Sequence, residues 1–73
     1  MLEKNEKRFI KSVGEKLREK RLSKHISQLM LSYDANVPVN QIGRIERGEI
    51  NTSLGTLYKI CTALGIDFKD LLD

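Results

Sequence analysis

Three side chains with hydrogen-bonding heads recur near the middle of the chain, at spacings of four and three residues: Asn40, Arg44 and Arg47. At about 100° per residue they fall on one side of a helix, whereas Ile42 and Ile45 fall on the other side. An amide can bond adenine at two atoms, and a guanidinium can bond guanine at two atoms or take a phosphate. Gly43 lies between the two sides and would leave bare backbone there. Such a face suits the major groove of DNA.

The helix that must carry this face has clear end signals. Pro38 suits its first turn, because the missing N–H would be unbonded there in any case. Gly48 is the kind of glycine that commonly follows the last helical residue. We therefore expect a helix from Pro38 to about Arg47.

A second short helix is predicted just before it, from Gln28 to about Ala35. Ser27 can cap its first amides, and Asn36 tolerates the left-handed conformation that a tight turn needs. Two helices of about eight residues, joined by a turn of three or four residues, have the helix-turn-helix geometry. The sequence places this unit at about residues 27–47.

Apolar residues at helical spacing predict a long first helix and two helices near the carboxyl end. The first runs from about Asn5 to Arg21 or Leu22, and Asp67 caps a last short helix. No strand of useful length is expected. The predicted fold is all-α, a compact five-helix domain that comprises residues 1–73, with residues 1–4 flexible.

The fourth helix is predicted to follow a cap at Ser53 or Thr52 and to end at Gly65. Its apolar stripe comprises Leu54, Leu57, Tyr58, Cys61 and Leu64. We expect Tyr58 and Cys61 to lie in the core.

Length and composition limit the possible classes of protein. A chain of 73 residues makes one domain with a small core. Cys61 is the single cysteine and His25 the single histidine, so neither a disulfide nor a zinc site is expected. Without a nucleophile–base pair or clustered carboxylates, we expect no enzyme activity, no cofactor, no metal and no small-molecule ligand. The charged start, MLEKNEKRF, resembles no signal peptide, so we expect a cytoplasmic protein without a membrane partner.

The net charge of +3 is unevenly distributed along the chain. Residues 1–25 contain nine basic and four acidic residues, a balance of +5, whereas residues 26–73 contain four basic and six acidic residues, a balance of −2. This asymmetry can direct a positive field toward phosphates, but a solvated helix with surface ion pairs would have the same composition.

The sequence also resembles the lambda and 434 repressor/Cro type of protein, the XRE family, over residues 14–72. The resemblance rests on four segments in order: G-E-K-L-R-E-K-R at 14–21, I-S-Q-L-M-L at 26–31, V-P-V-N-Q-I-G-R-I-E-R-G at 37–48, and S-L-G-T-L-Y-K-I-C-T-A-L-G-I at 53–66. It implies a lambda-repressor-like fold and a sequence-specific transcriptional regulator that binds double-stranded DNA.

The resemblance implies a role for particular residues. The positions that face DNA bases in the family are Val39, Asn40, Gly43 and Arg44. The positions that hold phosphates are Gln28, Asn51, Thr52 and Ser53, and Gln28 also props a side chain of the recognition helix. From its place near the helix end, Arg47 is expected to contact phosphate as well. Arg21 and Glu46 match an ion pair that ties the first helix to the third.

Two residues depart from the family pattern. His25 replaces the usual glycine after the first helix, so the loop either takes another shape or holds His25 in a left-handed conformation. Thr52 replaces the usual proline before the fourth helix, which leaves that loop less rigid.

A homodimer is expected, because a domain of this size can hardly bury all the apolar residues near its carboxyl end. The expected interface comprises Ile60, Leu64, Phe68, Leu71 and Leu72. A two-fold dimer would bind a pseudo-palindromic operator with half-sites about one helical turn apart. The same fold also serves antitoxins, restriction–modification controllers and protein-interaction modules, and these alternatives stay open.

Overall fold

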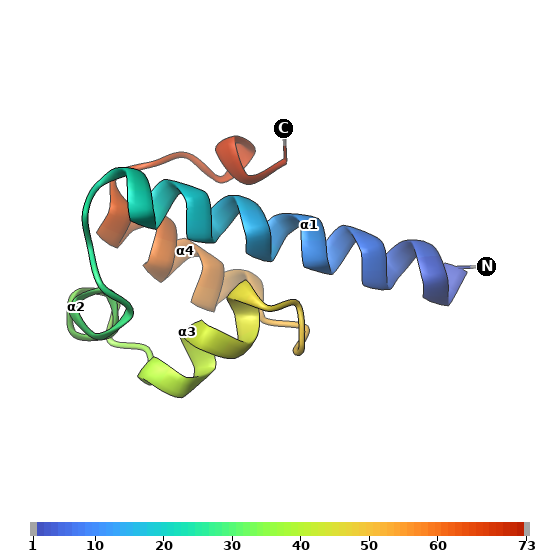
Figure 1. Cartoon of the computed structure of the whole chain (residues 1–73), viewed down its shortest axis with the longest axis horizontal. Helices are drawn as coiled ribbons and strands as arrows, with labels where there is room; N and C mark the ends of the chain where they lie inside the picture. The colour runs from blue at the N-terminus through green and yellow to red at the C-terminus, as the bar shows by residue number, and fades with distance from the viewer. Residues whose placement is uncertain (1, 73) are drawn as a thin grey trace.

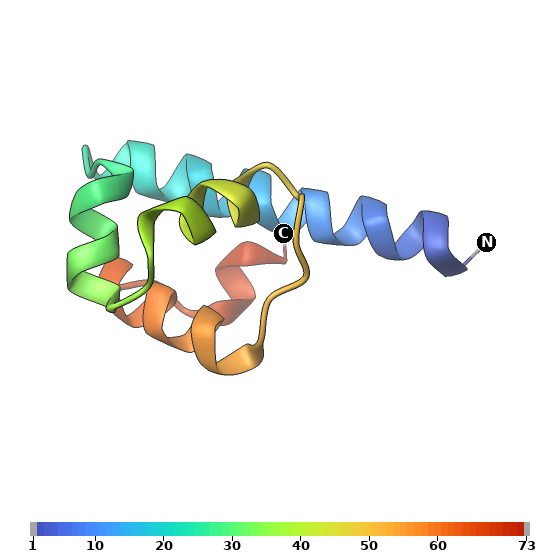
Figure 2. The same cartoon turned by 90° about the horizontal axis from the view of Figure 1, so that it is seen from below.

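The computed structural model describes the backbone of residues 2–72 and the side chains of residues 4–72. Its elements, in order, are the α-helices α1 (Leu2–Ser23), α2 (Gln28–Ala35), α3 (Val39–Glu46) and α4 (Leu54–Leu64), followed by the 3-10 helix η1 (Phe68–Leu71). The long α1 runs along one side of the molecule with α3 packed against it, and α2 packs against both α3 and α4 (Figure 1). Seen from below, α3 lies in front of α1, and α4 lies across the molecule from α1 (Figure 2).

The predicted all-α class is confirmed, and the predicted number of helices is corrected. Residues 2–72 form four α-helices, and the expected fifth is a single 3-10 turn. The first helix begins at Leu2, three residues earlier than predicted, so residues 2–4, which were expected to be flexible, have helical backbone. Met1 lies outside the described residues.

Local caps explain why the shorter helices begin where they do. The Ser27 hydroxyl accepts a hydrogen bond from the Met30 amide at 3.0 Å, and the Ser53 hydroxyl accepts one from the Thr56 amide at 3.1 Å. Each cap supports a helix start by about 1 kcal/mol. The caps predicted at Ser27 and Ser53 are therefore confirmed.

The core takes one fully buried side chain from every element: Leu17, Leu31, Ile42, Ile60 and Leu71. Burial of such a side chain stabilises a fold by roughly 1.5–3 kcal/mol. Because even the 3-10 turn contributes to this core, the carboxyl end is part of the folded unit. The buried thiol of Cys61 confirms its predicted place.

Two predictions about apolar residues were wrong. Tyr58 is 72% exposed, because Leu57, Ile60, Cys61 and Leu64 form the buried stripe of α4 and Tyr58 falls beside it. Ile60, Leu64 and Leu71 were expected at a subunit interface, but they are buried in the core of the chain itself. Phe68 and Leu72 are the members of that expected interface that stay exposed.

None of the helices in residues 2–72 combines the length and the apolar character that a bilayer crossing requires. The cytoplasmic location stays a prediction.

Candidate nucleic-acid interface

The helices α2 and α3 form a helix-turn-helix unit. Asn36 ends α2 in the left-handed conformation, with φ 57°, as its sequence position predicted. The Asn36 and Val37 amides both donate to the Ser32 carbonyl, and the buried Val37 side chain anchors the turn in the core. Pro38 directly precedes α3 as its N-cap residue. The turn therefore fixes the angle at which α3 leaves the core.

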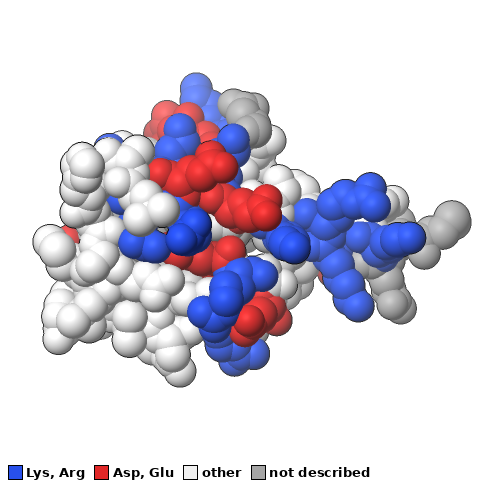
Figure 3. Space-filling model, viewed as in Figure 1, with Lys and Arg blue, Asp and Glu red and all other residues white. Residues whose placement is uncertain are grey.

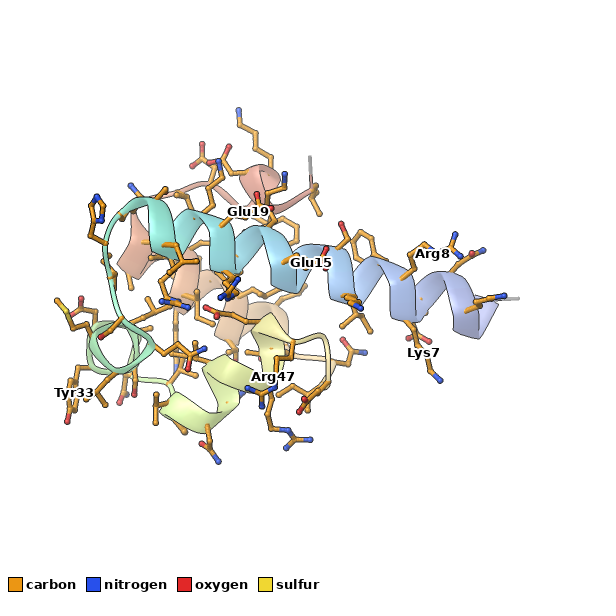
Figure 4. The ribbon with its side chains drawn as sticks, viewed as in Figure 1. Lys7, Arg8, Glu15, Glu19, Tyr33 and Arg47 are labelled. Carbon is orange, nitrogen blue, oxygen red and sulfur yellow. The ribbon has the colours of Figure 1, made fainter. Side chains whose placement is uncertain are left out.

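The side chains of α3 separate into two faces, as its periodicity predicted. Ile42 and Ile45 are buried, and Glu46 is buried beside them. The outer face, which we define as Val39, Asn40, Arg44 and Arg47, is exposed to solvent. The structure thus brings three of the four predicted base-facing residues together with Arg47 on one surface. Figure 4 shows Arg47 at this surface, directed away from α1.

The fourth predicted base-facing residue, Gly43, is buried. A Cβ atom at this position would lie 3.0 Å from Arg47 Nη1 and 3.5 Å from Gln28 Oε1. The expectation of bare backbone facing the groove is therefore wrong in this structure, because the side chains of Gln28 and Arg47 cover it. Because Gly43 has no side chain, Gln28 and Arg47 can pack against α3 at this position.

A buried hydrogen-bond network holds α3 against α1. Arg21 Nε donates to Glu46 Oε2 at 2.7 Å, and Arg21 Nη2 donates to Glu46 Oε1 at 3.0 Å. Arg21 Nη1 also donates to the Ile26 carbonyl at 2.8 Å, and Gln28 Nε2 donates to Glu46 Oε1 at 3.0 Å. With Arg21 6% and Glu46 3% exposed, the predicted ion pair is confirmed as buried. The Glu46 carboxylate of α3 thus binds side chains from α1 and α2, and Arg21 also ties α1 to the loop that follows it.

Gly14 allows this close contact between α1 and α3. A Cβ atom at Gly14 would lie 2.2 Å from the Ile45 carbonyl oxygen and 3.0 Å from the Glu46 carbonyl oxygen. Contacts that short do not occur between packed atoms, so the two helix backbones approach one another only because position 14 has no side chain.

The sequence reasoning missed one charged residue beside the outer face, Glu49. Arg47 Nε donates to Glu49 Oε2 at 2.7 Å and Arg47 Nη2 to Glu49 Oε1 at 3.4 Å, while Arg44 Nε lies 3.8 Å from Glu49 Oε1. The hydrogen bond from Arg47 lowers the pKa of the Glu49 carboxyl and raises the pKa of Arg47. Figure 3 shows acidic atoms among the basic atoms at this end of α3. No sequence motif marks Glu49. Its contact with Arg47 depends on the turn at Gly48, which brings Glu49 back toward the end of α3.

The loop before α4 presents only part of the predicted phosphate site. Asn51 and Ser53 are exposed, but the Ser53 hydroxyl already accepts from the Thr56 amide and donates to the Thr56 hydroxyl at 3.0 Å. Thr52 Oγ1 is buried and has no hydrogen-bond partner in the described part of the chain. In this conformation the Thr52 hydroxyl is not available to a phosphate, so the predicted phosphate contact of Thr52 stays a prediction for its backbone amide.

His25, the other departure from the family pattern, has φ 58° and is exposed. Of the two possibilities for this loop, the structure shows the left-handed conformation at His25. Its amide donates to the Leu22 carbonyl at 3.0 Å, which closes the end of α1 as a glycine would.

Comparison with known proteins connects this arrangement to a family. A helix-turn-helix family model matches residues 17–71, which include all of α2, α3 and α4. The chain belongs to the helix-turn-helix family, XRE type. The matched region contains the Arg21–Glu46 pair and the outer face of α3, so the resemblance found in the sequence is confirmed. This helix-turn-helix protein is a DNA-binding transcription regulator.

Individual relatives agree with this assignment. The control protein C.BamHI of Bacillus amyloliquefaciens is 46% identical over 61 residues, which cover 82% of this chain and 75% of that protein. The crystal structure of the restriction-modification controller protein C.AhdI from Aeromonas hydrophila has a TM-score of 0.83 at 35% identity and covers 85% of this chain and 94% of its own. The clp gene regulator ClgR from Corynebacterium glutamicum has a TM-score of 0.83 at 28% identity, covering 88% of this chain and 83% of that chain.

Proposed function

We propose that this helix-turn-helix protein controls transcription of restriction–modification genes by binding a pseudo-palindromic operator as a homodimer. The observation that carries the proposal is the outer face of α3, which projects polar side chains from a helix whose inner face is fixed in the core. The similarity to C.BamHI and to C.AhdI supports the choice of restriction–modification genes over other targets.

The residues of the outer face have distinct roles in this proposal. Asn40 bonds the N6 and N7 atoms of an adenine, and Val39 contacts a thymine methyl group. Arg44 bonds a guanine or a nearby phosphate, and Arg47, at the end of α3, contacts a phosphate. Both arginines must give up their contacts with Glu49 before they can bind DNA, because the Glu49 carboxylate lies within 4 Å of both guanidinium groups. Gln28 supports this face through Glu46 and Gly43.

The buried network gives this face a fixed direction. Arg21 holds Glu46 with two hydrogen bonds, and Glu46 belongs to α3 itself. A side chain that reads a base edge needs accurate placement, because a hydrogen bond weakens steeply when its angle is wrong. The network therefore supports specificity without touching DNA.

For the homodimer we propose a second copy of the chain on an apolar surface formed by α1, α4 and η1. Its centre is a hollow lined in part by Phe9, Ile50, Leu54 and Phe68. Phe9 is 57%, Leu54 76% and Phe68 44% exposed, which is unusual for large apolar side chains unless a partner covers them. This surface includes Phe68, which the sequence also predicted at the interface. It does not include Ile60, Leu64 and Leu71, because the core buries them.

The base contact is tested by selecting bound duplexes from random DNA and titrating variants against the selected operator. Asn40→Ala should lose roughly 1–3 kcal/mol of binding free energy and relax the preference at one or two base pairs in each half-site. Thr62→Ala removes a polar side chain from the exposed surface of α4, away from the outer face of α3, and is the control. Equal weakening of all duplexes by Asn40→Ala would mean that α3 does not read bases as proposed.

The homodimer is tested by sedimentation at several protein concentrations. Leu54→Glu should shift the protein to monomer and weaken operator binding, because a charge would be buried at the interface. Tyr33→Glu introduces the same charge at an exposed position of α2 and should leave the dimer intact. A wild-type protein that stays monomeric at tens of micromolar, with and without DNA, would exclude the proposed dimer.

A further inference from the structure

The amino-terminal end of α1 projects beyond the rest of the molecule in both ribbon views (Figures 1 and 2). It also lies before residue 17, where the family match begins. Residues 4–11, which we call the basic arm, contain four basic residues and the single acid Glu6: Lys4, Lys7, Arg8 and Lys11. All four basic residues are exposed, and Figure 3 shows basic atoms gathered at the projecting end of the molecule.

The direction of the arm follows from the contact between α1 and α3. Gly14 faces the backbone of Ile45 and Glu46, so its side of α1 is the side of α3. At about 100° per residue, Lys7 lies roughly 20° from Gly14 around the helix, Lys11 about 60° and Lys4 about 80° away. Figure 4 agrees, because Lys7 extends toward the side of α3 and Arg47, whereas Arg8 extends away from it.

The arm begins beside the carboxyl end of α3. A Cβ atom at Gly48 would lie 2.8 Å from Lys11 Cα, so the arm starts where the α3 turn leads into Glu49. From there it continues past the carboxyl end of α3, with Lys7 about 6 Å and Lys4 about 10 Å further along α1.

The height of the arm matches the rim of a major groove. Packed helix axes are typically about 8–10 Å apart, and the major groove of B-DNA is about 8.5 Å deep. When α3 lies in the groove, α1 therefore lies at about the level of the phosphates that border it. A lysine has a flexible stem and a compact charge, which suits a phosphate contact without sequence preference.

We propose that the basic arm is a second DNA-binding element, in which Lys4 and Lys7 bind backbone phosphates beside the groove that α3 enters. The arm adds affinity and sets the register of the protein on the duplex, and α3 reads the sequence. This inference rests on the proposed function, because it takes its direction from α3 in the major groove.

The test is a salt titration of Lys4→Gln/Lys7→Gln on the selected operator and on random duplex. Each phosphate contact contributes about 0.9 to the slope of log affinity against log salt, so the variant should lower the slope by about 1.8 for each protomer, or about 3.6 for a homodimer that binds through both arms. The affinity loss between 50 and 200 mM salt should therefore be about tenfold smaller than that of the wild type for each arm, or roughly 100-fold smaller for the homodimer. The base preference, measured on single-base variants of the operator, should stay unchanged.

Two controls separate the arm from general charge. Lys59→Gln/Lys69→Gln removes the same charge from exposed positions on α4 and η1, and Arg8→Gln removes a charge from the other side of the arm. Each control should change the slope by less than half as much as Lys4→Gln/Lys7→Gln does. Ethylation of duplex phosphates locates the contact. Ethylation of a phosphate that the arm contacts should weaken binding of the wild type but not binding of the variant.

The outcomes distinguish the two proposals. If the wild type selects no sequence from random DNA, the proposed function fails and the arm inference fails with it. If the wild type selects an operator and Asn40→Ala relaxes it, but Lys4→Gln/Lys7→Gln behaves like the Lys59→Gln/Lys69→Gln control, the arm inference alone is overturned.

Discussion

The contact between α1 and α3 predicts a large effect of adding one methyl group at Gly14. In Gly14→Ala, the new Cβ atom would lie 2.2 Å from the Ile45 carbonyl oxygen, which is more than 1 Å closer than ordinary contact. The obstructing atom is backbone, so the two helices must move apart. Movement would also stretch the Arg21–Glu46 hydrogen bonds of 2.7 and 3.0 Å, which cross the same helix pair.

The magnitude follows from two opposing terms. Overpacking of a tight contact costs about 1–3 kcal/mol, and a clash with backbone belongs at the upper end. Alanine in place of glycine inside a helix regains about 1 kcal/mol. We expect a net loss of about 2 kcal/mol in the free energy of unfolding. For a domain of this size, the melting temperature should fall by roughly 8–16 °C, measured by circular dichroism.

Gly55→Ala is the matched control for Gly14→Ala. Gly55 also lies in a helix, but its added Cβ would meet nothing closer than Ser53 Oγ at 3.9 Å. This variant should therefore gain from a few tenths to about 1 kcal/mol through helix propensity alone. If Gly14→Ala melts at or above the wild-type temperature while Gly55→Ala behaves as expected, the close packing of α1 on α3 is refuted.

Three further predictions concern charged and polar side chains. Glu46→Ala should cost roughly 3–5 kcal/mol in urea unfolding, because it leaves the buried Arg21 guanidinium unpaired, and an unchanged midpoint would contradict that burial. Thr52→Val should leave stability and operator affinity almost unchanged or slightly improved, because Thr52 Oγ1 has no hydrogen-bond partner among the described residues; a clear loss in either assay would show that the hydroxyl is used. The carboxyl pKa of Glu49 is lowered by Arg47, so the small stability of this exposed pair is present above the ordinary carboxyl pKa and disappears as the pH falls through the lowered value. In an NMR titration, Arg47→Ala should raise the pKa of Glu49, and no change would contradict the pairing.

The features that the sequence predicted well depend on short-range chemistry. The start of α2 at Gln28 and of α4 at Leu54 follow from serine caps, whose partners lie three residues away. The left-handed turn at Asn36 depends on that residue alone. The outer face of α3 follows from helical periodicity within eight residues. Each of these signals is complete within one stretch of the chain.

The features that the sequence missed depend on contacts between distant segments. Gly43 is covered because Gln28 and Arg47 fold over it, which periodicity within α3 does not reveal. Leu71 is buried because the last turn returns to the core, so its burial depends on the whole fold. Tyr58 lies at the edge of the apolar stripe of α4, where a single residue of helical rotation decides between core and solvent.

The burial of Leu71 also has a consequence for timing. The carboxyl-terminal turn completes the core within a single chain, so under the homodimer proposal association is an equilibrium separate from folding and governed by mass action. On the homodimer proposal, the amount of dimer rises as the square of the amount of protomer while dimers are scarce. Doubling the supply then raises the operator-binding species about fourfold. A regulator built in this way stays almost inactive early after its synthesis begins and then acts over a narrow range of abundance.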